Sequence, residues 1–224
     1  MKKDLFKKMK LIITGGYGYI GSNIARHLTS KGHEIIIFDY IEKPSNMLYL
    51  HCVSKKCDIT NFKELESIKI PNVDAVLHLA AQSSGPNSIN IPEKDINLNI
   101  NGTLNMIKWC GSNNVKKILF ASSFVVYGDG NEQADESDHC YPKSIYALSK
   151  YYCERLFDIY AEHLDLDWNI SRMFNVYGPG QDLNRDDQGM VSIFLKKVMN
   201  ENYIGVKGSL DRFRDFIFID DIVQ

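Results

Sequence analysis

Short apolar runs and longer stretches of helical periodicity alternate along this chain. Runs rich in β-branched and aromatic residues predict strands at Lys10–Ile13, Glu34–Asp39, His51–Cys57 (the weakest), Asp74–Leu79, Lys117–Ala121 and Asn169–Asn175. Apolar residues recur on one helical face at Ile20–Ser30, Asn61–Ser67, Glu93–Cys110, Ser144–Leu164 and Met190–Asn200. Strands that alternate with helices predict an α/β fold, a doubly wound parallel sheet covered on both faces. Ligands of such sheets bind beyond the carboxyl ends of the strands.

A glycine-rich segment follows the first predicted strand directly. Thr14-Gly15-Gly16-Tyr17-Gly18-Tyr19-Ile20-Gly21 stands between that strand and the first helix. Gly15 allows a tight turn, Gly18 lets the backbone approach a pyrophosphate, and Gly21 lets the helix pack close to the sheet. The first helical turn, at Tyr19 and Ile20, then offers free N–H groups to phosphates. The glycines are three residues apart, which differs from the common G-x-G-x-x-G spacing.

An acid ends the second predicted strand. Asp39 follows Gly21 by eighteen positions, where a carboxylate hydrogen-bonds the 2′-hydroxyl of an adenine ribose. A carboxylate there repels a 2′-phosphate, so we predict NAD rather than NADP. The alternative is that Asp39 only ends a strand, but strand, glycine loop, helix, strand and acid all come in the expected order. Asp58, after the third strand, can accept the adenine amino group, and it can also serve as a helix N-cap near Thr60.

A tyrosine and a lysine lie one turn apart near the start of a long predicted helix. Tyr146 and Lys150 are four residues apart, so their side chains share a face. A phenol has a pKa of about 10, and we expect the ammonium to lower it. The phenolate could then take a proton from a sugar hydroxyl while hydride leaves the same carbon, with Ser123 aligning the substrate oxygen. Alone, this pattern commonly marks an exposed helical face; after a glycine loop of this kind it favours a catalytic site.

Charge and cysteine usage narrow the class of protein. The net charge of −2 over 224 residues points to no nucleic-acid or membrane partner, and no apolar run is long enough to span a bilayer. The five cysteines are scattered without a C-x-x-C pair, which predicts free thiols in a reducing, cytoplasmic setting. The histidines lack metal-ligand spacing, so we expect no metal.

Taken together, the motifs resemble the extended short-chain dehydrogenase/reductase family, in its NAD-dependent epimerase/dehydratase branch. The matching segments are T-G-G-x-G-x-x-G at 14–21, Asp39, Asp58-Ile59, H-L-A-A-Q at 78–82, Asn99 in N-I-N-G-T, S-S-F-V-V-Y-G at 122–128, Y-A-L-S-K at 146–150, R-M-F-N-V-Y-G-P-G-Q at 172–181 and R-D-F-I-F-I-D-D-I-V at 214–223. They cover nearly the whole chain in the order typical of the family.

The resemblance implies a Rossmann-like fold with NAD as cofactor and a nucleotide-diphosphate sugar as partner. It implies cofactor contacts from Gly15, Gly18, Tyr19, Ile20, Gly21, Asp39, Asp58, Ile59, Leu79, Ala80, Ala81, Asn99 and Lys150. It implies Ser123, Tyr146 and Lys150 as catalytic residues, with Ser123 preferred to Ser122 because the family's hydroxyl stands four residues before Tyr127. Substrate contacts are implied for Gln82, Ser123, Asn175 and Arg214. Arg214 can instead form a surface ion pair with Asp211 or Asp215.

The residues after Ser123 bear on the reaction within this branch. Dehydratases of the branch carry an acidic pair there, whereas this chain has Phe124 and Val125, which cannot exchange protons. Epimerisation at carbon 4 needs only the serine, tyrosine and lysine, so we expect a 4-epimerase. A 4-ketoreductase of the same branch would have the same motifs and stays open as an alternative.

The resemblance also suggests a division of the chain. We expect a disordered leader at 1–9, an NAD-binding domain at 10–180, part of a small substrate-binding region at 181–213, and a return segment at 214–224. Family members continue beyond this point, so the rival expectation is an NAD-binding remnant without catalysis. Tyr152, Leu156, Ile159 and Tyr160 follow helical spacing; they fit either a homodimer interface of the family's kind or ordinary intramolecular core.

Overall fold

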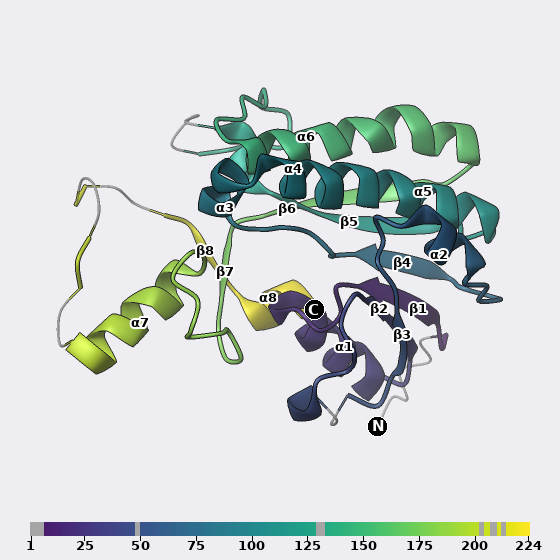
Figure 1. The fold of residues 1–224 in the computed structure, drawn as a ribbon, viewed down its shortest axis with the longest axis horizontal. Coiled ribbons are helices and arrows are strands. Elements are labelled where there is room, and N and C mark those ends of the chain that lie inside the picture. Colours follow the sequence, from purple (N-terminus) through teal and green to yellow (C-terminus); the bar gives the residue numbers. More distant parts are fainter. Residues whose placement is uncertain (1–6, 48–49, 129–132, 202–203, 207–209, 212–213) are drawn as a thin grey trace.

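A six-stranded parallel sheet forms the centre of the structure, a computed structural model that describes residues 7–47, 50–128, 133–201, 204–206, 210–211 and 214–224. The strands are β1 (Lys10–Thr14), β2 (Glu34–Asp39), β3 (Val53–Lys56), β4 (Ala75–His78), β5 (Lys117–Ser123) and β6 (Asp167–Met173), in the order β3-β2-β1-β4-β5-β6 (Figure 1). The order reverses between β1 and β4, so the loops after these two strands border the switch point at which such sheets bind ligands.

The two faces of the sheet carry separate apolar cores because side chains alternate along each strand. Leu11 and Ile13 of β1 face a core shared with Ile24 of α1 (Tyr19–Ser30) and with α8 (Ile219–Val223). Ile12 faces the opposite core, which includes Trp109. That second face is covered by α2 (Phe62–Ser67), α4 (Pro92–Asp95), η2 (Ile96–Asn101), α5 (Gly102–Ser112) and α6 (Ile145–Leu156). The predicted doubly wound, Rossmann-like fold is confirmed.

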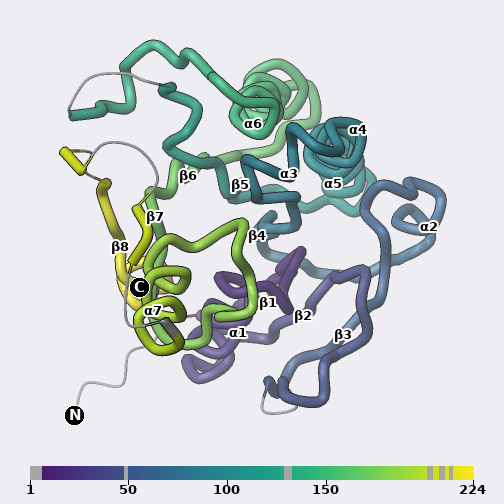
Figure 2. Tube along the Cα trace, turned by 60° about the vertical axis from the view of Figure 1, so that its left-hand side comes forward, coloured from purple at the N-terminus to yellow at the C-terminus, as the bar shows by residue number. Residues whose placement is uncertain are grey.

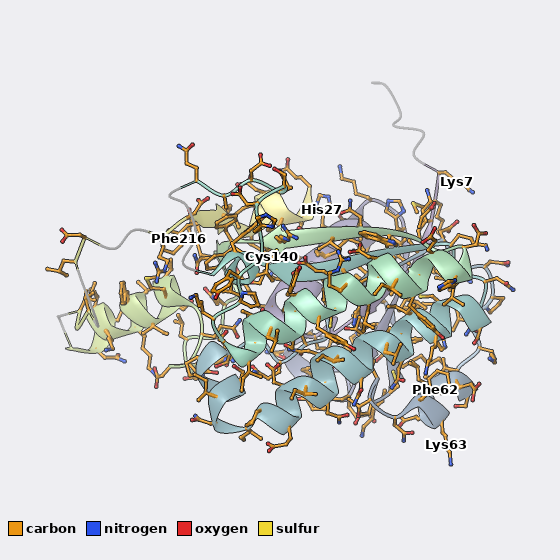
Figure 3. The ribbon with its side chains drawn as sticks, turned by 90° about the horizontal axis from the view of Figure 1, so that it is seen from above. Lys7, His27, Phe62, Lys63, Cys140 and Phe216 are labelled. Atoms are coloured by element: carbon orange, nitrogen blue, oxygen red, sulfur yellow. The ribbon has the colours of Figure 1, made fainter. Side chains whose placement is uncertain are left out.

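Two long helical segments lie side by side on the second face. One runs through α4, η2 and α5 and contains a wider π-type stretch; the other continues from α6 through η4 (Phe157–Ala161) and η5 (Glu162–Leu164) (Figure 3). Ser144 starts the second segment by accepting the Ala147 N–H at 3.1 Å. Both segments were predicted from their periodicity, although the wider turns were not.

A second, two-stranded parallel sheet and one helix stand beside the main sheet. Strand β7 (Asn175–Tyr177) pairs with β8 (Phe216–Phe218), and α7 (Met190–Glu201) extends away from both (Figures 1 and 2). The predicted strand Asn169–Asn175 is therefore two strands, interrupted at Phe174. The sequence did not predict five short elements, which are η1 (Ser45–Met47), α3 (Gly85–Asn90), η3 (Phe124–Tyr127), β8 and α8. The proposed domain limits at 181 and 214 stay predictions.

The described part of the chain bears on two further expectations. Residues 1–6 of the predicted leader lie outside the described residues, while Met9 donates its N–H to His33 Nδ1 at 3.2 Å and accepts the Glu34 N–H at 2.8 Å. In the ranges that the structure describes, no helix is both long and apolar enough to cross a membrane.

A chain of hydroxyl and imidazole groups joins β1, β4 and α5 inside the protein. Thr14 Oγ1 accepts the N–H groups of Leu79 and Ala80, each at 3.1 Å, and lies 2.7 Å from His78 Nδ1. Because the threonine oxygen already accepts twice, its hydrogen points to Nδ1. The imidazole therefore carries its proton on Nε2, which donates to Thr103 Oγ1 at 3.1 Å. The neutral tautomer of His78 thus holds two strands and a helix together.

This arrangement predicts an acid-sensitive contribution to stability. Burial, assisted by the charge of Lys150, lowers the pKa of His78 to about 3, whereas an unfolded histidine titrates near pH 6.5. Below about pH 6.5 the unfolded chain binds a proton that the folded protein refuses, so falling pH destabilises the fold. His78→Gln keeps a donor and an acceptor without titrating. Its urea midpoint should therefore fall less than that of the native protein between about pH 7 and about pH 4.5. Equal losses would contradict this account of His78.

Candidate functional site

The glycine loop after β1 and the loop after β4 touch through their backbones. Gly15 has φ +66°, and a Cβ there would stand 2.8 Å from the Ala80 Cα. A Cβ on Gly21 would collide with the Gly15 carbonyl oxygen, which itself accepts the Gly18 N–H at 3.0 Å. Glycine is therefore required where the loop meets the β4 loop (Leu79–Gln82) and where α1 packs against the turn. These close approaches bear on the turn at Gly15 and the helix packing at Gly21, whereas the phosphate approach at Gly18 stays a prediction.

The first turn of α1 presents its backbone donors toward this loop. Gly18 is the N-cap, no side chain caps the helix, and no acidic residue lies in the first turn. The first hydrogen bond within the helix runs from the Ser22 N–H to the Gly18 carbonyl oxygen at 2.9 Å. The N–H groups of Tyr19, Ile20 and Gly21 precede it and have no partner within the helix. Such a helix start fits a diphosphate group.

The carboxylate of Asp39 is buried and held by backbone groups. Its Oδ2 accepts the Tyr17 N–H of the glycine loop at 3.1 Å, and its Oδ1 accepts the Ile41 N–H at 3.3 Å. Burial raises the pKa of Asp39, and these N–H groups act in the opposite direction. Each carboxylate oxygen keeps acceptor capacity for a ribose hydroxyl. The end of β2 is thus tied to the glycine loop.

Asp58 and Ile59 follow β3 with different exposures. Asp58 is exposed, and its Oδ1 accepts the N–H and the hydroxyl of Thr60 at 2.9 and 2.8 Å. The side chain of Ile59 is buried, and its carbonyl accepts Asn105 Nδ2 at 2.9 Å. The N-cap of α2 is Asn61, so the N-cap interpretation of Asp58 is wrong. Asp58 makes a local turn with Thr60 and stays at the surface.

The side chain of Asn99 is hydrogen-bonded to the backbone of the β4 loop. Its Oδ1 accepts the Gln82 N–H at 2.8 Å, and its Nδ2 donates to the Gln82 carbonyl at 3.1 Å and to Ser149 Oγ at 3.0 Å. Both amide hydrogens are therefore used within the protein. Asn99 thus orients the loop that carries Leu79, Ala80 and Ala81, and its predicted contact with the cofactor stays a prediction.

The predicted Ser123, Tyr146 and Lys150 come together at the end of β5 and the start of α6. Burial raises the pKa of Tyr146 to about 12, opposed by a hydrogen bond with the Ser123 side chain. Lys150 Nζ donates to the Ala121 carbonyl at 2.8 Å and lies 4.7 Å from the centre of the Phe120 ring. The expectation that Lys150 lowers the pKa of Tyr146 is wrong for this structure, because burial of the phenol dominates and the ammonium is directed at β5.

The two serines at the end of β5 have different partners. Ser122 Oγ donates to Glu154 Oε1, and the buried Glu154 forms an ion pair with the half-buried Arg172 at 2.8 Å. Arg172 also donates to the Tyr127 hydroxyl at 3.0 Å. Ser123 is the serine that reaches Tyr146. This division of partners is consistent with the choice of Ser123 over Ser122.

Besides Ser123 at the end of β5, the predicted substrate contacts lie in three separate parts of the chain. Gln82 belongs to the β4 loop, and its Nε2 donates to the Ser84 carbonyl at 2.9 Å. Asn175 begins β7, and its Nδ2 donates to the Asp215 carbonyl at 2.8 Å, which ties β7 to β8. Arg214 stands exposed just before β8. The side-chain amides of Gln82 and Asn175 therefore already carry structural bonds.

Sequence reasoning missed several residues that shape this site. The Thr14, His78 and Thr103 chain was not anticipated, nor was Asp95, whose Oδ2 accepts Gln82 Nε2 at 2.9 Å. Asp95 stands four residues before Asn99 on a helical pattern, so the shared face was a usable signal. The loop before α7 was also missed; it reaches the α3 region through Ser83 Oγ, which donates to Gln188 Oε1 at 2.8 Å. Among the described residues, no group of three His, Cys, Asp or Glu side chains could hold a metal ion.

Fold and site together define a class of protein. The protein has a doubly wound sheet, a glycine loop after β1 and a buried acid at the end of β2. It also has a tyrosine and a lysine one turn apart. This combination is typical of dinucleotide-dependent enzymes. The model of the NAD dependent epimerase/dehydratase family matches residues 11–224, and this chain belongs to that family, a branch of the extended short-chain dehydrogenases/reductases. Its cofactor is NAD, which the free helix N-terminus and the placement of Asp39 fit.

Named relatives include more than one reaction type. The chain is 32% identical over 221 residues to a putative UDP-glucose 4-epimerase of Methanocaldococcus jannaschii, covering 96% of this chain and 71% of that protein. It is 32% identical to a dTDP-D-glucose 4,6-dehydratase of Dictyostelium discoideum, covering 100% of this chain and 55% of the relative. Both comparisons show the same branch, and they differ in the reaction named.

Solved structures agree on the fold. A UDP-N-acetylglucosamine 4-epimerase from Methanobrevibacter ruminantium M1, in complex with UDP-N-acetylmuramic acid, has a TM-score of 0.88 and 32% identity, covering 97% of this chain and 71% of that one. A Thermus thermophilus UDP-glucose 4-epimerase in complex with NAD has a TM-score of 0.86 and 29% identity, covering 96% and 72%. The chain thus spans about seven tenths of the length of these structures.

The placement of Asp39 predicts how the cofactor is selected. Asp39→Asn keeps the shape and one acceptor oxygen but removes the charge. The affinity for NAD should fall by about tenfold, since a hydrogen bond to a charged group contributes roughly 1.5 kcal/mol or more. The affinity for NADP should rise because the repulsion of a 2′-phosphate is lost. Calorimetric titration with both dinucleotides measures the gap. Asp74→Asn is the control, because Asp74 likewise accepts a backbone N–H, that of Lys10, at the opposite end of the sheet. Equal binding of NAD and NADP by the native chain would refute the role of Asp39.

Proposed function

We propose that this chain epimerises a nucleotide-diphosphate sugar at carbon 4, with Tyr146 as the base. The observation that carries the proposal is the contact between Ser123 and Tyr146 beside the buried Lys150. The two residues after Ser123 are Phe124 and Val125, which cannot exchange protons with a sugar. This favours a reaction that needs one acid–base group over an elimination that needs more.

Each residue of the group has a separate task in this proposal. Tyr146 takes the proton of the sugar hydroxyl and returns it later, while Ser123 orients the oxygen through its own hydroxyl. Lys150 supplies positive charge in a region of low dielectric, where a charge acts strongly. NAD, when bound, supplies the acceptor and donor of a hydride. Because the pKa of Tyr146 is about 12 in this structure, the phenol is protonated at neutral pH until further positive charge or hydrogen bonding favours the phenolate.

The proposed cofactor contacts are supported by the geometry of the switch point. The N–H groups of Tyr19 and Ile20 would hold the diphosphate, Asp39 the adenine ribose, and Asp58 with Ile59 the adenine edge. Leu79, Ala80 and Ala81 would lie against the flat part of the cofactor because Asn99 and Thr14 fix their backbone. Lys150 would contact the second ribose.

The sugar-nucleotide contacts are proposed for the side that faces β7 and α7. Gln82 and Ser123 border the reacting sugar, Asn175 offers its remaining amide oxygen, and the guanidinium of Arg214 suits a diphosphate through paired hydrogen bonds. Phe124 stacks on Phe174 with ring centres 5.0 Å apart and planes 11° apart. That stack forms an apolar wall directly after Ser123.

A 4-ketoreductase is the second candidate, because the same three residues suffice for it. One relative that supports it is a dTDP-4-dehydro-6-deoxyglucose reductase of Escherichia coli, 31% identical over 229 residues. The two reactions differ in their net use of the cofactor. An epimerase regenerates its cofactor, whereas a reductase consumes one reduced dinucleotide for each sugar. Absorbance of the reduced cofactor during turnover of UDP- and dTDP-sugars distinguishes them.

The catalytic assignment predicts unequal effects of two substitutions. Tyr146→Phe should lower turnover by at least about a hundredfold while NAD affinity stays nearly unchanged. Lys150→Ala should lower both, since the lysine is proposed to hold the cofactor ribose as well. A coupled 4-epimerase assay and calorimetry provide the two measurements. Tyr152→Phe, which removes an exposed phenol from the same helix, is the control and should change neither. Activity retained by Tyr146→Phe would show that another group is the base.

We also propose that the chain acts in the cytoplasm as a homodimer. The five cysteines form no disulfide, as expected in a reducing compartment. Leu148, Tyr152 and Ile159 are 55%, 50% and 62% exposed and recur along one face of α6 and η4. Leu156 and Tyr160 pack instead against the core, so of the four residues considered for an interface, Tyr152 and Ile159 face outward. An exposed apolar stripe of this kind is typical of protein interfaces.

The exposed stripe predicts a substitution that separates the two subunits. Ile159→Asp places a charge in the proposed interface and should convert a dimer into a monomer at a protein concentration of tens of micromolar, a rough range for weak dimers. Light scattering coupled to size exclusion measures the mass. Val53→Asp, at a 51% exposed apolar position on β3, is the matched control and should leave the dimer intact. A native chain that stays monomeric over this range would rule out the dimer.

A further inference from the structure

A carboxylate is completely buried beneath the β4 loop and has no assigned task. Asp95, the last residue of α4, is 0% exposed. Its Oδ2 accepts Gln82 Nε2 at 2.9 Å, whereas its Oδ1 has no hydrogen-bond partner among the described residues. Leaving a buried acceptor without a partner is costly, more so when it is charged. A positive charge nearby would offset this cost.

A buried cation, Lys150, interacts electrostatically with Asp95 and likewise has no directly bonded partner of opposite charge among the described residues. Lys150 lies on α6, next to Ser149, which receives a hydrogen bond from Asn99 at 3.0 Å. Its Nζ has one protein hydrogen bond, to the Ala121 carbonyl, although an ammonium has three donors. Within the described part of the chain, Lys150 forms no ion pair within 4.0 Å.

The other titratable groups that face Lys150 do not supply a free negative charge. Glu154 of α6 is already paired with Arg172 at 2.8 Å and receives the Ser122 hydroxyl. Cys153 donates to the Asn99 carbonyl, and burial raises the pKa of its thiol to about 11, so it is neutral at pH 7. His78 of β4 is neutral as well. Asp95 is the facing carboxylate without an ion-pair partner of its own.

We propose that Asp95 is a positioning residue that acts through Lys150: its carboxylate is the buried counter-charge that keeps the lysine ammonium charged beside Tyr146. The functional meaning of this pairing rests on the role proposed for Lys150, but the pairing itself is a property of the protein alone. Gln82, which is hydrogen-bonded to Asn99, donates to one carboxylate oxygen of Asp95. The other oxygen carries no hydrogen bond from the described residues that would compete with the charge of Lys150. The groups of α6 that Asp95 faces are Tyr146, Lys150 and Cys153.

The directions of the pKa changes agree with this arrangement. Burial lowers the pKa of Lys150 to about 8, and Asp95 is among the groups that oppose this. Burial raises the pKa of Asp95, while the Ser149 and Gln82 side chains and the charge of Lys150 act in the opposite direction. The same carboxylate also raises the pKa of Tyr146. Asp95 therefore favours a resting site with a charged amine and a neutral phenol.

The test is a direct titration of Lys150 in the full chain, without cofactor or substrate. The protein is labelled with ¹³C at lysine Cε, and the Lys150 signal is identified by its absence in Lys150→Met. Asp95→Asn keeps the volume and one acceptor oxygen but removes the charge. We expect the midpoint of Lys150 to fall by about one pH unit or more, which is the effect of losing one opposite charge nearby. Glu93→Gln is the matched control, because Glu93 is an exposed carboxylate two residues away on the same helix and should leave the midpoint unchanged.

An unchanged Lys150 midpoint in a folded Asp95→Asn protein overturns the proposal. An equal fall of that midpoint in Glu93→Gln overturns it too, because the effect would then be a general one of net charge. Should Asp95→Asn not fold, the reciprocal experiment decides: Lys150→Met must raise the midpoint of the Asp95 carboxyl carbon, since coupling between two sites is mutual. An unmoved Asp95 signal there also overturns the proposal. Because the readout is ionisation and not turnover, it stands apart from the epimerase assay, whose failure would leave the pairing untouched.

Discussion

The contact between the glycine loop and the β4 loop is the constraint on which the rest of the site depends. Gly15 and Ala80 meet through their backbones, and the Thr14 hydroxyl binds two successive N–H groups of the β4 loop. With a side chain at position 15, the two loops could not close the switch point. His78 extends the same network into α5 through Thr103, so hydrogen bonds link the two strand ends to a helix. The surface that faces the cofactor is therefore set by main-chain contacts.

Burial controls the electrostatics of the site more than pairwise attraction does. Tyr146 and Lys150 lie one turn apart, yet burial raises the pKa of the phenol to about 12 and lowers the pKa of the amine to about 8, in both cases toward the neutral form. Desolvation disfavours every charge in a region of low dielectric. The charges that persist there have compensation: Arg172 has Glu154, and Asp39 has backbone N–H groups. The degree of burial of each side chain therefore sets its pKa, and with it whether the group is protonated at neutral pH.

Much of the fold was predictable because its signals are local. The period of apolar residues located β1, β2, β4 and β5, and both long helical segments, to within a few residues. The errors have physical causes. The strand predicted across Asn169–Asn175 divides at Phe174, where the chain passes from the main sheet to the small one. Short α3 carries a Ser84 cap and a proline in its first turn, but six residues give too little periodicity to detect. Strand β8 exists only because β7 pairs with it.

By itself, the sequence determined the order of strands and helices, the glycine turn, the acid after β2 and the one-turn spacing of Tyr146 and Lys150, because each depends on neighbours within a few residues. Only the tertiary structure decided that Asn61 and not Asp58 caps α2, and that both amide hydrogens of Asn99 are bonded within the protein. It also decided that Asp95 is buried with one oxygen unpaired. Burial, and with it the ionisation of a side chain, depends on what packs against it from distant parts of the chain, and no local pattern encodes that.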